Sequence, residues 1–322
     1  MPTIAAERRR NMSISKTPLV VIAGPTASGK TSLSIELAKR FNGEIISADS
    51  MQIYKHMDIG TAKPTADEMS GIRHHMLDVC LPDEEFSVFS YSEMAKKHIN
   101  DIHLSGKLPI MVGGTGLYID NVVQNIMLAK TKSDNSLRER LNNEANEKGN
   151  LHMYNMLEKL DPKAAENIHP NNIRRVIRAL EVYYETGNTF TNQIENSKKE
   201  ESPYNSIIFM PNWDRETLYK RIDKRVDIMF EDGLLREFFS LVDMGYTHKL
   251  NSMQAIGYKE LFAYYRGFCS LDEAKNDIKK HSRNYAKRQL TWFKRNKDII
   301  LLDTNENMVS EAIEHILGAF YS

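Results

Sequence analysis

The sequence predicts an α/β protein in which helices cover both faces of a parallel sheet and a small all-helical domain interrupts the core. Two observations lead to this expectation. Short apolar segments rich in β-branched residues alternate with segments of helical spacing near both ends of the chain, as strands joined by crossover helices require. From about residue 130 to 201 the chain is instead polar and helical in pattern, without a convincing strand. We therefore expect an α/β core at 17–125 and 202–322 and a helical insertion at 126–201.

The expected strands are short and apolar, and glycine or polar residues bound them. In chain order they are residues 18–24, 43–49, 108–114, 206–212 and 298–303, with 74–79 as a weaker candidate. Their nearly continuous apolar character indicates strands that are buried on both faces, which is typical of a parallel sheet.

Helical spacing occupies most segments between the strands. We expect helices at 31–41, 87–107, 115 onward, 172–187, 215–242 and 270–296, and a last one at the C-terminus. Several ends carry capping signals: Ser270 and Glu273 predict a capping box, and Asp161 followed by Pro162 predicts a helix start inside the insertion. Gly187 should close the helix that precedes it.

Composition limits the class of protein. The chain has 322 residues, 41% of them hydrophobic, which is enough for a sizeable core. With 43 basic and 43 acidic residues, any nucleic-acid surface must be local. Cys80 and Cys269 form no disulfide framework or metal cluster, which favours a reducing cytosol. No apolar run is long enough to span a bilayer, and the N-terminal arginines lack the apolar segment of a secretory signal. We expect a cytoplasmic protein that does not enter membranes, with a monomer as the default.

The segment GPTASGKT follows the first expected strand and opens the first expected helix, as a phosphate-binding loop does. Backbone N–H groups and the helix N-terminus favour an anion, Lys30 adds a positive charge, and the Thr31 hydroxyl suits Mg²⁺. Together with the alternating pattern, the loop indicates a three-layer core like that of the P-loop nucleoside triphosphatases. It predicts binding of a di- or triphosphate without specifying the reaction. The binding candidates are Gly24, Pro25, Thr26, Ala27, Ser28, Gly29, Lys30 and Thr31.

Polar residues follow three other expected strands or loops. Ligands of open α/β sheets gather at the carboxyl ends of strands, so we expect Asp49 to face the loop and to accept a proton from a nucleophile. Asp49 can also cap the turn that follows it, and the two roles are compatible. Thr115 would either cap a helix or hydrogen-bond the substrate, and Lys63 would either reach a phosphate or remain solvated.

Several segments taken together resemble those of a known family. GPTASGKT, DSMQIYKHMDIGTAKP, GGTGLYI and HPNNIRRVIRALE, in this order and spacing, resemble the bacterial tRNA dimethylallyltransferases, also called tRNA isopentenyltransferases. RIDKRVDIMFEDGL, AIGYKEL and AKRQLTWFKR extend the resemblance over most of residues 18–297. The phosphate-binding loop alone is generic, whereas the set of segments is specific. Residues 1–17 and the tail after about 303 lie outside it.

The resemblance implies a reaction. The loop would hold the diphosphate of dimethylallyl diphosphate, with Mg²⁺, as a leaving group. The dimethylallyl group would go to N6 of the adenosine immediately 3′ of the anticodon, in tRNAs that read codons beginning with U, to give N6-isopentenyladenosine and diphosphate. Thr26 would touch the diphosphate or the reacting centre, Lys30 would stabilise the leaving group, and Asp49 would be the general base. Arg225 is a candidate for a second diphosphate contact, although an ordinary ion pair on its helix is an alternative.

Contacts to the anticodon stem-loop of tRNA follow partly from the resemblance and partly from charge. The resemblance places them at Asp49, Ser50, Met51, Gln52 and Thr115. Two basic helical stretches add Arg174, Arg175 and Arg178 with the intervening Val176 and Ile177, and Arg283 with Lys287. The first stretch can instead pair with Glu181 and Glu185, and the second can be a solvated face. Clustering of this kind in a chain of zero net charge favours RNA and predicts binding that weakens with salt.

Three other functions fit parts of the sequence. A prenyltransferase acting on a free adenine nucleotide would need neither the insertion nor the basic C-terminal helix. A P-loop small-molecule kinase would turn over ATP and supply arginines from a lid, which the arginines after Asn172 resemble. A non-catalytic RNA-binding module would have no reason to keep Lys30, Thr31 and Asp49 together.

Overall fold

The structure, a computed structural model, describes residues 16–126, 135–197 and 201–321. The chain divides into two compact units, one made of Met1–Val122 and Pro203–Ser322 and the other of Val123–Ser202. The expectations for the N-terminal 15 residues and for 127–134 lie outside the described ranges.

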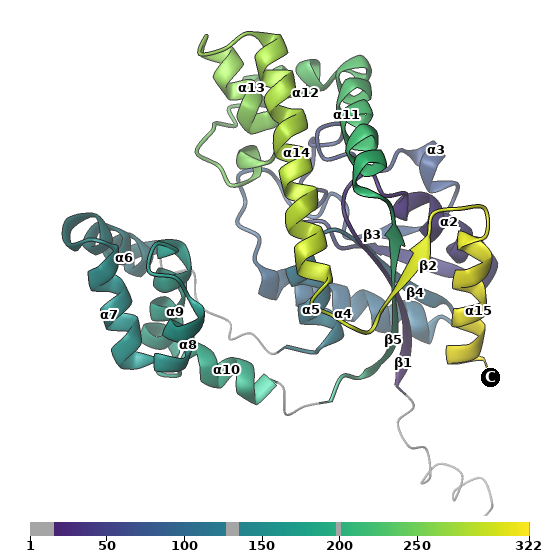
Figure 1. Cartoon of the computed structure of the whole chain (residues 1–322), viewed down its shortest axis with the longest axis horizontal. Coiled ribbons are helices and arrows are strands. Elements are labelled where there is room, and N and C mark those ends of the chain that lie inside the picture. The colour runs from purple at the N-terminus through teal and green to yellow at the C-terminus, as the bar shows by residue number, and fades with distance from the viewer. Residues whose placement is uncertain (1–15, 127–134, 198–200, 322) are drawn as a thin grey trace, which may run out of the picture. The chain divides into compact units, whose positions relative to one another are not determined.

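The first unit contains a six-stranded sheet in the order β3-β2-β4-β1-β5-β6, and every pairing is parallel (Figure 1). The strands are β1 (Thr17–Ala23), β2 (Gly43–Ser47), β3 (His74–His75), β4 (Leu108–Gly113), β5 (Tyr204–Asn212) and β6 (Ile299–Asp303). The weakest candidate, 74–79, forms only a two-residue edge strand. Ala23 pairs with Gly113, and Ser47 with Val112, so the carboxyl ends of β1, β4 and β2 lie side by side.

Helices cover both faces of this sheet, which confirms the predicted three-layer α/β class. α2 (Lys30–Phe41) and α15 (Met308–Phe320) lie on one side, and α4 (Val88–Leu104) lies on the other (Figure 1). Leu33 and Leu37 of α2 share a buried cluster with Val20 and Ile22 of β1. On α4, Tyr91 is fully buried and its hydroxyl donates to the Ser47 carbonyl at 2.9 Å.

The first unit contains further helices besides these three. They are α3 (Ala66–Met69), α5 (Gly116–Val123), α11 (Arg215–Asp232), α12 (Leu234–Asp243), the 3₁₀ turn η1 (Ser252–Gln254), α13 (Tyr258–Tyr265) and α14 (Leu271–Phe293). The expectation of one helix at 215–242 is wrong, because Gly233 takes φ 105° and ends α11. A left-handed glycine at this point redirects the chain into α12. The predicted capping box of Ser270 and Glu273 is confirmed at the start of α14.

The second unit is helical throughout its described residues. It contains α6 (Asn135–Lys148), α7 (Asn150–Leu160), α8 (Pro162–Asn167), α9 (Ile173–Thr186) and α10 (Phe190–Ser197). Asp161 caps α8 through the N–H of Ala164 at 3.1 Å, with Pro162 at the first helical position as predicted. Gly187 ends α9 in the left-handed conformation, also as predicted. No helix in the described parts of either unit is long and apolar enough to cross a membrane.

Candidate active site

The phosphate-binding loop links β1 to α2 and is held by Trp213, which follows β5, and by Arg221 of α11. The carbonyl of Ala27 accepts from Arg221 Nε at 2.8 Å, and that of Ser28 accepts from Trp213 Nε1 at 2.9 Å. The Arg221 guanidinium lies 4.4 Å from the centroid of the Trp213 ring, so the two anchors support each other. With these carbonyls engaged by side chains, loop N–H groups other than that of Thr26, which donates to Gln289, are natural ligands for an anion.

Lys30 is folded over the loop. Its Nζ donates to the carbonyl of Pro25 at 2.5 Å. Burial, followed by the charge of nearby Arg225, lowers the pKa of Lys30 to about 7, and Asp49 opposes the shift. A lysine whose charge is this poorly compensated is suited to receive an anionic ligand.

Arg225, on α11, also contacts the loop. Its Nη1 donates to the Thr26 hydroxyl at 3.1 Å, and its Nη2 donates to the Ala62 carbonyl at 3.3 Å. Burial lowers the pKa of Arg225, the carboxylate of Asp49 counters that effect, and a guanidinium remains charged in any case. The structure therefore brings Arg225 to the loop and does not pair it along its own helix.

Gln289, on α14, is a site residue that the sequence did not reveal. Its Oε1 accepts from the N–H of Thr26 at 3.2 Å and its Nε2 donates to the Gly114 carbonyl at 3.0 Å. The side chain is only 5% exposed. A Cβ on Gly114 would lie 2.1 Å from Gln289 Nε2, and one on Gly113 would lie 2.1 Å from the Ala48 carbonyl oxygen. The two glycines thus allow the end of β4 to approach both β2 and α14, which explains their place in GGTGLY.

Asp49 follows β2 beside this loop. Its Oδ1 accepts from the N–H of Met51 at 2.9 Å, so the expected turn-capping role is present. The same carboxylate acts on the pKa of both Lys30 and Arg225, which places it close to the two cations. Burial, with Asp49 as the next cause, raises the pKa of Tyr285 to about 12. Asp49 is therefore an acidic group close to two buried cations.

The residues after Asp49 are held by protein groups. The hydroxyl of Thr115 accepts from the N–H of Ser50 at 3.0 Å, a contact that neither expectation for Thr115 included. Gln52 accepts from the Ser47 hydroxyl at 2.9 Å and donates to the Ala62 carbonyl at 3.0 Å. These bonds fix the shape of the turn, so the Gln52 amide reaches an RNA base only where a protein partner is exchanged.

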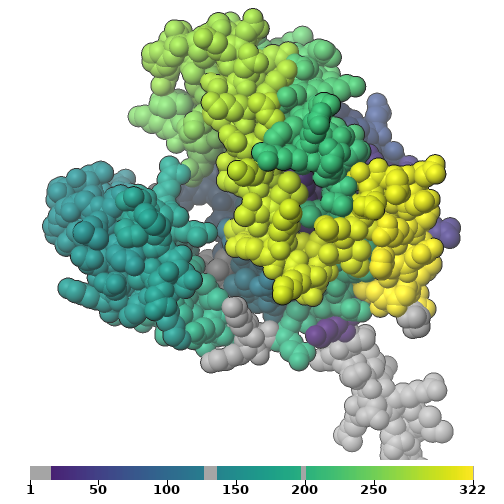
Figure 2. Space-filling model, viewed as in Figure 1, coloured from purple at the N-terminus to yellow at the C-terminus, as the bar shows by residue number. Residues whose placement is uncertain are grey.

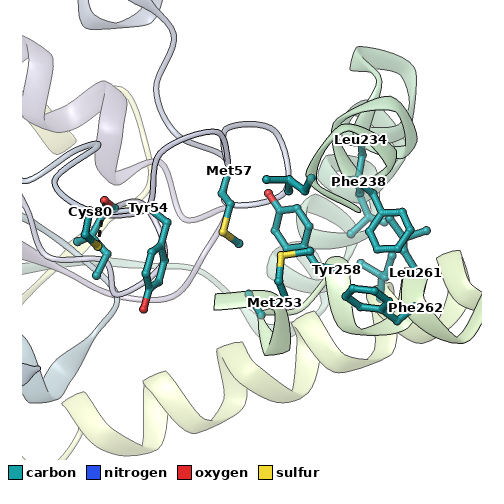
Figure 3. Close-up of a cluster of buried hydrophobic side chains, with 14 residues drawn as sticks. Tyr54, Met57, Cys80, Leu234, Phe238, Met253, Tyr258, Leu261 and Phe262 are labelled. Carbon is teal, nitrogen blue, oxygen red and sulfur yellow. Dashed lines mark hydrogen bonds between the residues drawn. The ribbon is translucent and has the colours of Figure 1, made fainter. Parts of the chain in front are cut away.

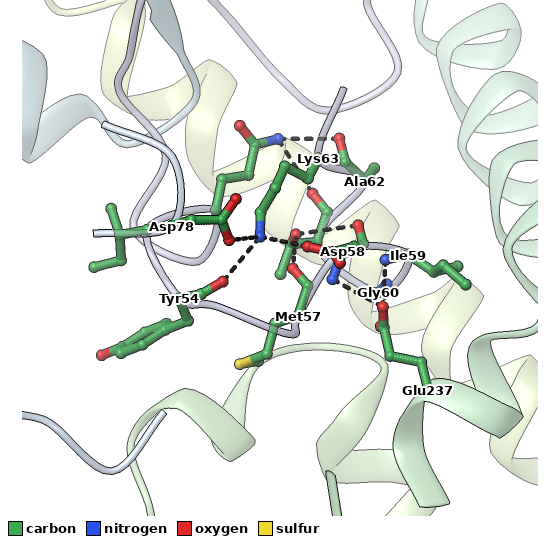
Figure 4. Close-up of polar contacts among 12 residues, drawn as sticks. Tyr54, Met57, Asp58, Ile59, Gly60, Ala62, Lys63, Asp78 and Glu237 are labelled. Carbon is green, nitrogen blue, oxygen red and sulfur yellow. Dashed lines mark hydrogen bonds and ion pairs between the residues drawn. The ribbon is translucent and has the colours of Figure 1, made fainter. Parts of the chain in front are cut away.

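Lys63 is neither solvated nor free to meet a phosphate, so both expectations for it are wrong. Its side chain is 6% exposed. Its Nζ contacts Asp58 at 2.5 Å and Asp78 at 2.6 Å, and it donates to the Tyr54 carbonyl at 2.9 Å (Figure 4). Two carboxylates and a carbonyl use all three donors of the ammonium group.

The basic stretch on α9 divides into two kinds of residue. Arg174 and Arg175 are exposed, whereas Val176 and Ile177 are 0% and 4% exposed and pack in the core of the helical unit. The side chains of Val176 and Ile177 therefore do not suit the predicted tRNA contact. Arg178 is partly buried and contacts Glu181.

Glu181 holds more than one arginine. It is 3% exposed and accepts a forked pair of bonds from Arg138 at 2.6 and 3.1 Å, besides a contact to Arg178 at 3.4 Å. The alternative to RNA binding, an ion pair with Glu181, is thus observed for Arg178. Arg174 and Arg175 remain the exposed cations of this stretch.

Helix α14 carries the second basic stretch. Arg283 pairs with Asp223 of α11, and Lys287 is exposed. A cavity of about 450 Å³ lies between this helix and the segment after β5, with Pro25, Trp213 and Lys287 among its lining residues. Figure 2 shows this face, where α14 and α11 flank a hollow with N-terminal residues at its base. Lys287 is thus the exposed cation of the predicted pair.

The described side chains offer few ligands for a metal ion. Among the described residues, no group of three or more His, Cys, Asp or Glu side chains is arranged to hold a metal ion. Thr31 is exposed at the start of α2. One hydroxyl suits Mg²⁺ that takes its remaining ligands from diphosphate oxygens and water, which is how Mg²⁺ is usually bound with phosphates.

The chain is similar to one family of known proteins. Residues 52–296 match the profile of the IPP transferase family. A tRNA dimethylallyltransferase of Acetivibrio thermocellus is 52% identical over 89% of this chain and 92% of its own length. One from Bacillus cytotoxicus is 49% identical over 93% of this chain and 95% of its own.

Solved structures of similar proteins come from the same family. The tRNA isopentenylpyrophosphate transferase of Bacillus halodurans is similar over 94% of this chain and 97% of its own, with a TM-score of 0.71 at 45% identity. A eukaryotic dimethylallyltransferase acting on tRNA is similar over 93% of this chain and 79% of its own, with a TM-score of 0.79 at 33% identity. The chain therefore belongs to the IPP transferase family, the family of the tRNA dimethylallyltransferases.

Proposed function

We propose that this enzyme transfers the dimethylallyl group of dimethylallyl diphosphate to N6 of the adenosine immediately 3′ of the anticodon, in tRNAs that read codons beginning with U. One observation carries the proposal beyond the family assignment. Arg225 bonds to Thr26 at the front of a phosphate-binding loop, with the Asp49 carboxylate close to both Arg225 and Lys30. The site thus combines cations for a leaving diphosphate with one base for a nucleophile.

In this proposal the allylic C1–O bond breaks as N6 forms a bond to C1. The departing diphosphate gains negative charge, which Lys30, Arg225 and the loop N–H groups stabilise because they are already oriented. Lys30 would exchange the Pro25 carbonyl for a diphosphate oxygen. Mg²⁺ held by the diphosphate and Thr31 would supply further positive charge to the leaving group.

Asp49 is the proposed base. The lone pair of an adenine amino group is delocalised into the ring, so N6 is a weak nucleophile until its proton is removed. Oδ1 of Asp49 is engaged by the turn, whereas Oδ2 has no hydrogen bond among those of the described residues, and we assign N6–H to it. After transfer, the proton resides on Asp49 and diphosphate is released.

The tRNA is the proposed acceptor. The target adenosine must leave its stack to enter the site, which costs a few kcal/mol. We propose that the turn at Asp49–Gln52, Thr115 and Lys287 contact the anticodon loop, and that Arg174, Arg175 and Arg178 of the helical insertion bind tRNA phosphates. The exposure of Arg174, Arg175 and Lys287 supports this assignment. Free thiols at Cys80 and Cys269 agree with a cytoplasmic enzyme, for which we expect a monomer.

A substrate panel tests the activity. Enzyme with labelled dimethylallyl diphosphate and Mg²⁺ is incubated with unmodified tRNA, with AMP, or with buffer, and ATP hydrolysis is followed separately. The proposal expects label in tRNA alone and no ATP turnover. Label in AMP would favour the free-nucleotide prenyltransferase, and brisk ATP turnover would favour the kinase.

A further inference from the structure

Residues 57–63, here called the 57–63 loop, are held at one end by a single carboxylate. Glu237 projects from the first turn of α12 toward the backbone of this loop (Figure 4). Its carboxylate accepts from the N–H groups of Asp58 at 2.8 Å, Ile59 at 2.7 Å and Gly60 at 3.0 Å, and from the Tyr258 hydroxyl at 2.6 Å. Hydrogen bonds to an ionised acceptor are about twice as strong as neutral ones, so this contact determines where the loop backbone lies.

The other end of the loop is fixed by Lys63. Its ammonium group binds Asp58 within the loop and Asp78 outside it. The N–H of Lys63 also donates to the Asp58 carbonyl at 2.9 Å, which closes the loop on itself. The 57–63 loop is therefore a rigid element with two charged anchors, and the hydrogen bonds of Glu237 and Lys63 go to residues outside the phosphate-binding loop.

The rigid element presents a carbonyl to the active site. The Ala62 carbonyl accepts from Arg225 Nη2 at 3.3 Å and from Gln52 Nε2 at 3.0 Å. The other arm of Arg225 donates to Thr26 at 3.1 Å. Because Arg225 is held at both arms, a displacement of the Ala62 carbonyl would also displace the guanidinium from Thr26.

The Tyr258 partner of Glu237 is part of a buried hydrophobic cluster. Tyr258 is 0% exposed and lies in the cluster that also contains Met57, Phe238 and Leu261 (Figure 3). Burial, followed by the charge of Glu237, raises the pKa of Tyr258 well above its usual value, so its hydroxyl remains a donor. A Cβ on Gly60 would lie 2.5 Å from Tyr258 Cζ, so glycine is required for the loop to approach this ring.

We propose that Glu237 is a positioning residue for Arg225. It acts by fixing the backbone of the 57–63 loop, whose Ala62 carbonyl orients the guanidinium toward Thr26 and the leaving diphosphate. Lys63 serves the same purpose from the other end. The inference rests on the proposed function, because the diphosphate is the group that Arg225 would meet.

Glu237→Gln tests the proposal with little change of volume. An amide cannot accept three backbone N–H bonds as the carboxylate does, and its NH₂ group faces other donors. We expect faster hydrogen exchange at 58–60, a single-turnover rate lower by roughly ten- to a hundredfold, as small misplacements of catalytic groups produce, and a KM for tRNA within about twofold of wild type. Glu231→Gln, at an exposed position on α11, removes the same charge and should leave all three unchanged.

Coupling to Arg225 separates positioning from a general loss of folding. In an Arg225→Ala background, Glu237→Gln should change the single-turnover rate by less than about twofold, because the group that it positions is gone. Lys63→Met, which keeps the aliphatic stem, should behave in the same way and replaces Glu237→Gln if that variant does not fold. Rate losses that multiply in the double variants, or a wild-type rate in a folded Glu237→Gln or Lys63→Met enzyme, would overturn the proposal.

Pyrophosphate binding provides a measurement that needs no tRNA. By calorimetry, Glu237→Gln should weaken the affinity for inorganic pyrophosphate in the wild-type background and not in Arg225→Ala. Equal affinity of wild type and Glu237→Gln would overturn the positioning role. If wild-type enzyme fails to modify tRNA while the coupling in pyrophosphate binding is observed, the proposed function fails and the positioning role stands.

Discussion

Arg225 donates to the hydroxyl of Thr26 at 3.1 Å, although 199 positions separate the two residues in the sequence. Thr26 belongs to the loop after β1, and Arg225 to the helix that follows β5. The entire helical unit lies between them in the sequence. The phosphate site is therefore assembled from chain segments on both sides of the insertion, through the adjacent positions of β1 and β5 in the sheet.

Asp49→Asn should slow transfer severely and leave substrate binding in place. The amide keeps the size of the side chain and can still accept from the N–H of Met51, but it cannot take the N6 proton. General bases contribute about 10²- to 10⁴-fold, and we expect a loss in that range for the single-turnover rate. Gel-shift affinity for unmodified tRNA should stay within about threefold of wild type. A normal rate would show that another group is the base.

Lys30→Met should weaken the binding of inorganic pyrophosphate. Methionine fills the space of the aliphatic stem and removes the only lysine of the loop. Loss of a charge-assisted bond to a phosphate typically costs about 1.5–3 kcal/mol, or roughly 10- to 150-fold in Kd. Isothermal calorimetry measures the change, and Lys39→Met, at an exposed position on α2, is the control. Equal affinities for wild type and Lys30→Met would place the diphosphate elsewhere.

Pyrophosphate binding should also take up a proton above neutral pH. Burial lowers the pKa of Lys30 to about 7 in the ligand-free enzyme, so the side chain is largely neutral at pH 8. An anion beside it restores the charged form. Calorimetry at pH 8 in buffers of different ionisation enthalpy should therefore report up to about one proton absorbed per site. The uptake should vanish in Lys30→Met, and its persistence there would assign the proton to another group.

The same pKa predicts the sign of a stability change. Lys30 binds fewer protons in the folded state than in the unfolded state between about pH 7 and its ordinary pKa. Folding stability from this group should therefore rise with pH across that interval and be flat below it. The melting temperature of wild type relative to Lys30→Met should increase from pH 7 to pH 9, and a decrease would contradict the shift.

Gln289→Leu should destabilise the phosphate-binding loop. The change leaves the N–H of Thr26 and the carbonyl of Gly114 without their partner in a buried place, which typically costs about 1–3 kcal/mol of stability. The melting temperature and the affinity for inorganic pyrophosphate should both decrease. Thr291→Val, two residues further along α14 at an exposed position, is the control for the helix itself. Wild-type stability and affinity in Gln289→Leu would mean that the loop holds its shape without this bridge.

Arg174→Ala should raise the KM for tRNA and reduce the salt dependence of binding. Each lost phosphate contact lowers the slope of log K against log salt by roughly 0.7–0.9. Arg178→Ala should have the same effect together with a lower melting temperature, because Arg178 also contacts buried Glu181. Lys159→Ala, an exposed cation on α7, serves as a control in the same unit. An unchanged slope in Arg174→Ala would move the RNA surface away from this helix.

The sequence predicted the strands and the phosphate-binding loop because those features depend on local pattern. Alternation of apolar strands with helices indicated the parallel sheet, and the glycine-rich motif located the loop at the end of β1. The break at Gly233 was missed because hydrophobic spacing continues across it from α11 into α12, and only the backbone conformation shows the change of direction.

Residues that act through long-range contacts were not predictable in the same way. Gln289 and Glu237 lie on ordinary amphipathic helices, where a single Gln or Glu carries no local signal of its partner. Lys63 was misjudged because its carboxylate partners, Asp58 and Asp78, lie in two different turns that only the folded chain brings together. Arg225 was a candidate for a diphosphate contact with a helical ion pair as the alternative, and the structure supplied the contact with Thr26.

Mapping the modified nucleotide tests the central claim most directly. Unmodified tRNA that reads codons beginning with U is incubated with enzyme, Mg²⁺ and dimethylallyl diphosphate, digested with a base-specific ribonuclease and analysed by mass spectrometry. We expect one added dimethylallyl group on N6 of the adenosine 3′ of the anticodon with wild type, and far less product with Asp49→Asn after the same time. An unmodified tRNA, a label at another position, or an equal yield from Asp49→Asn would contradict it.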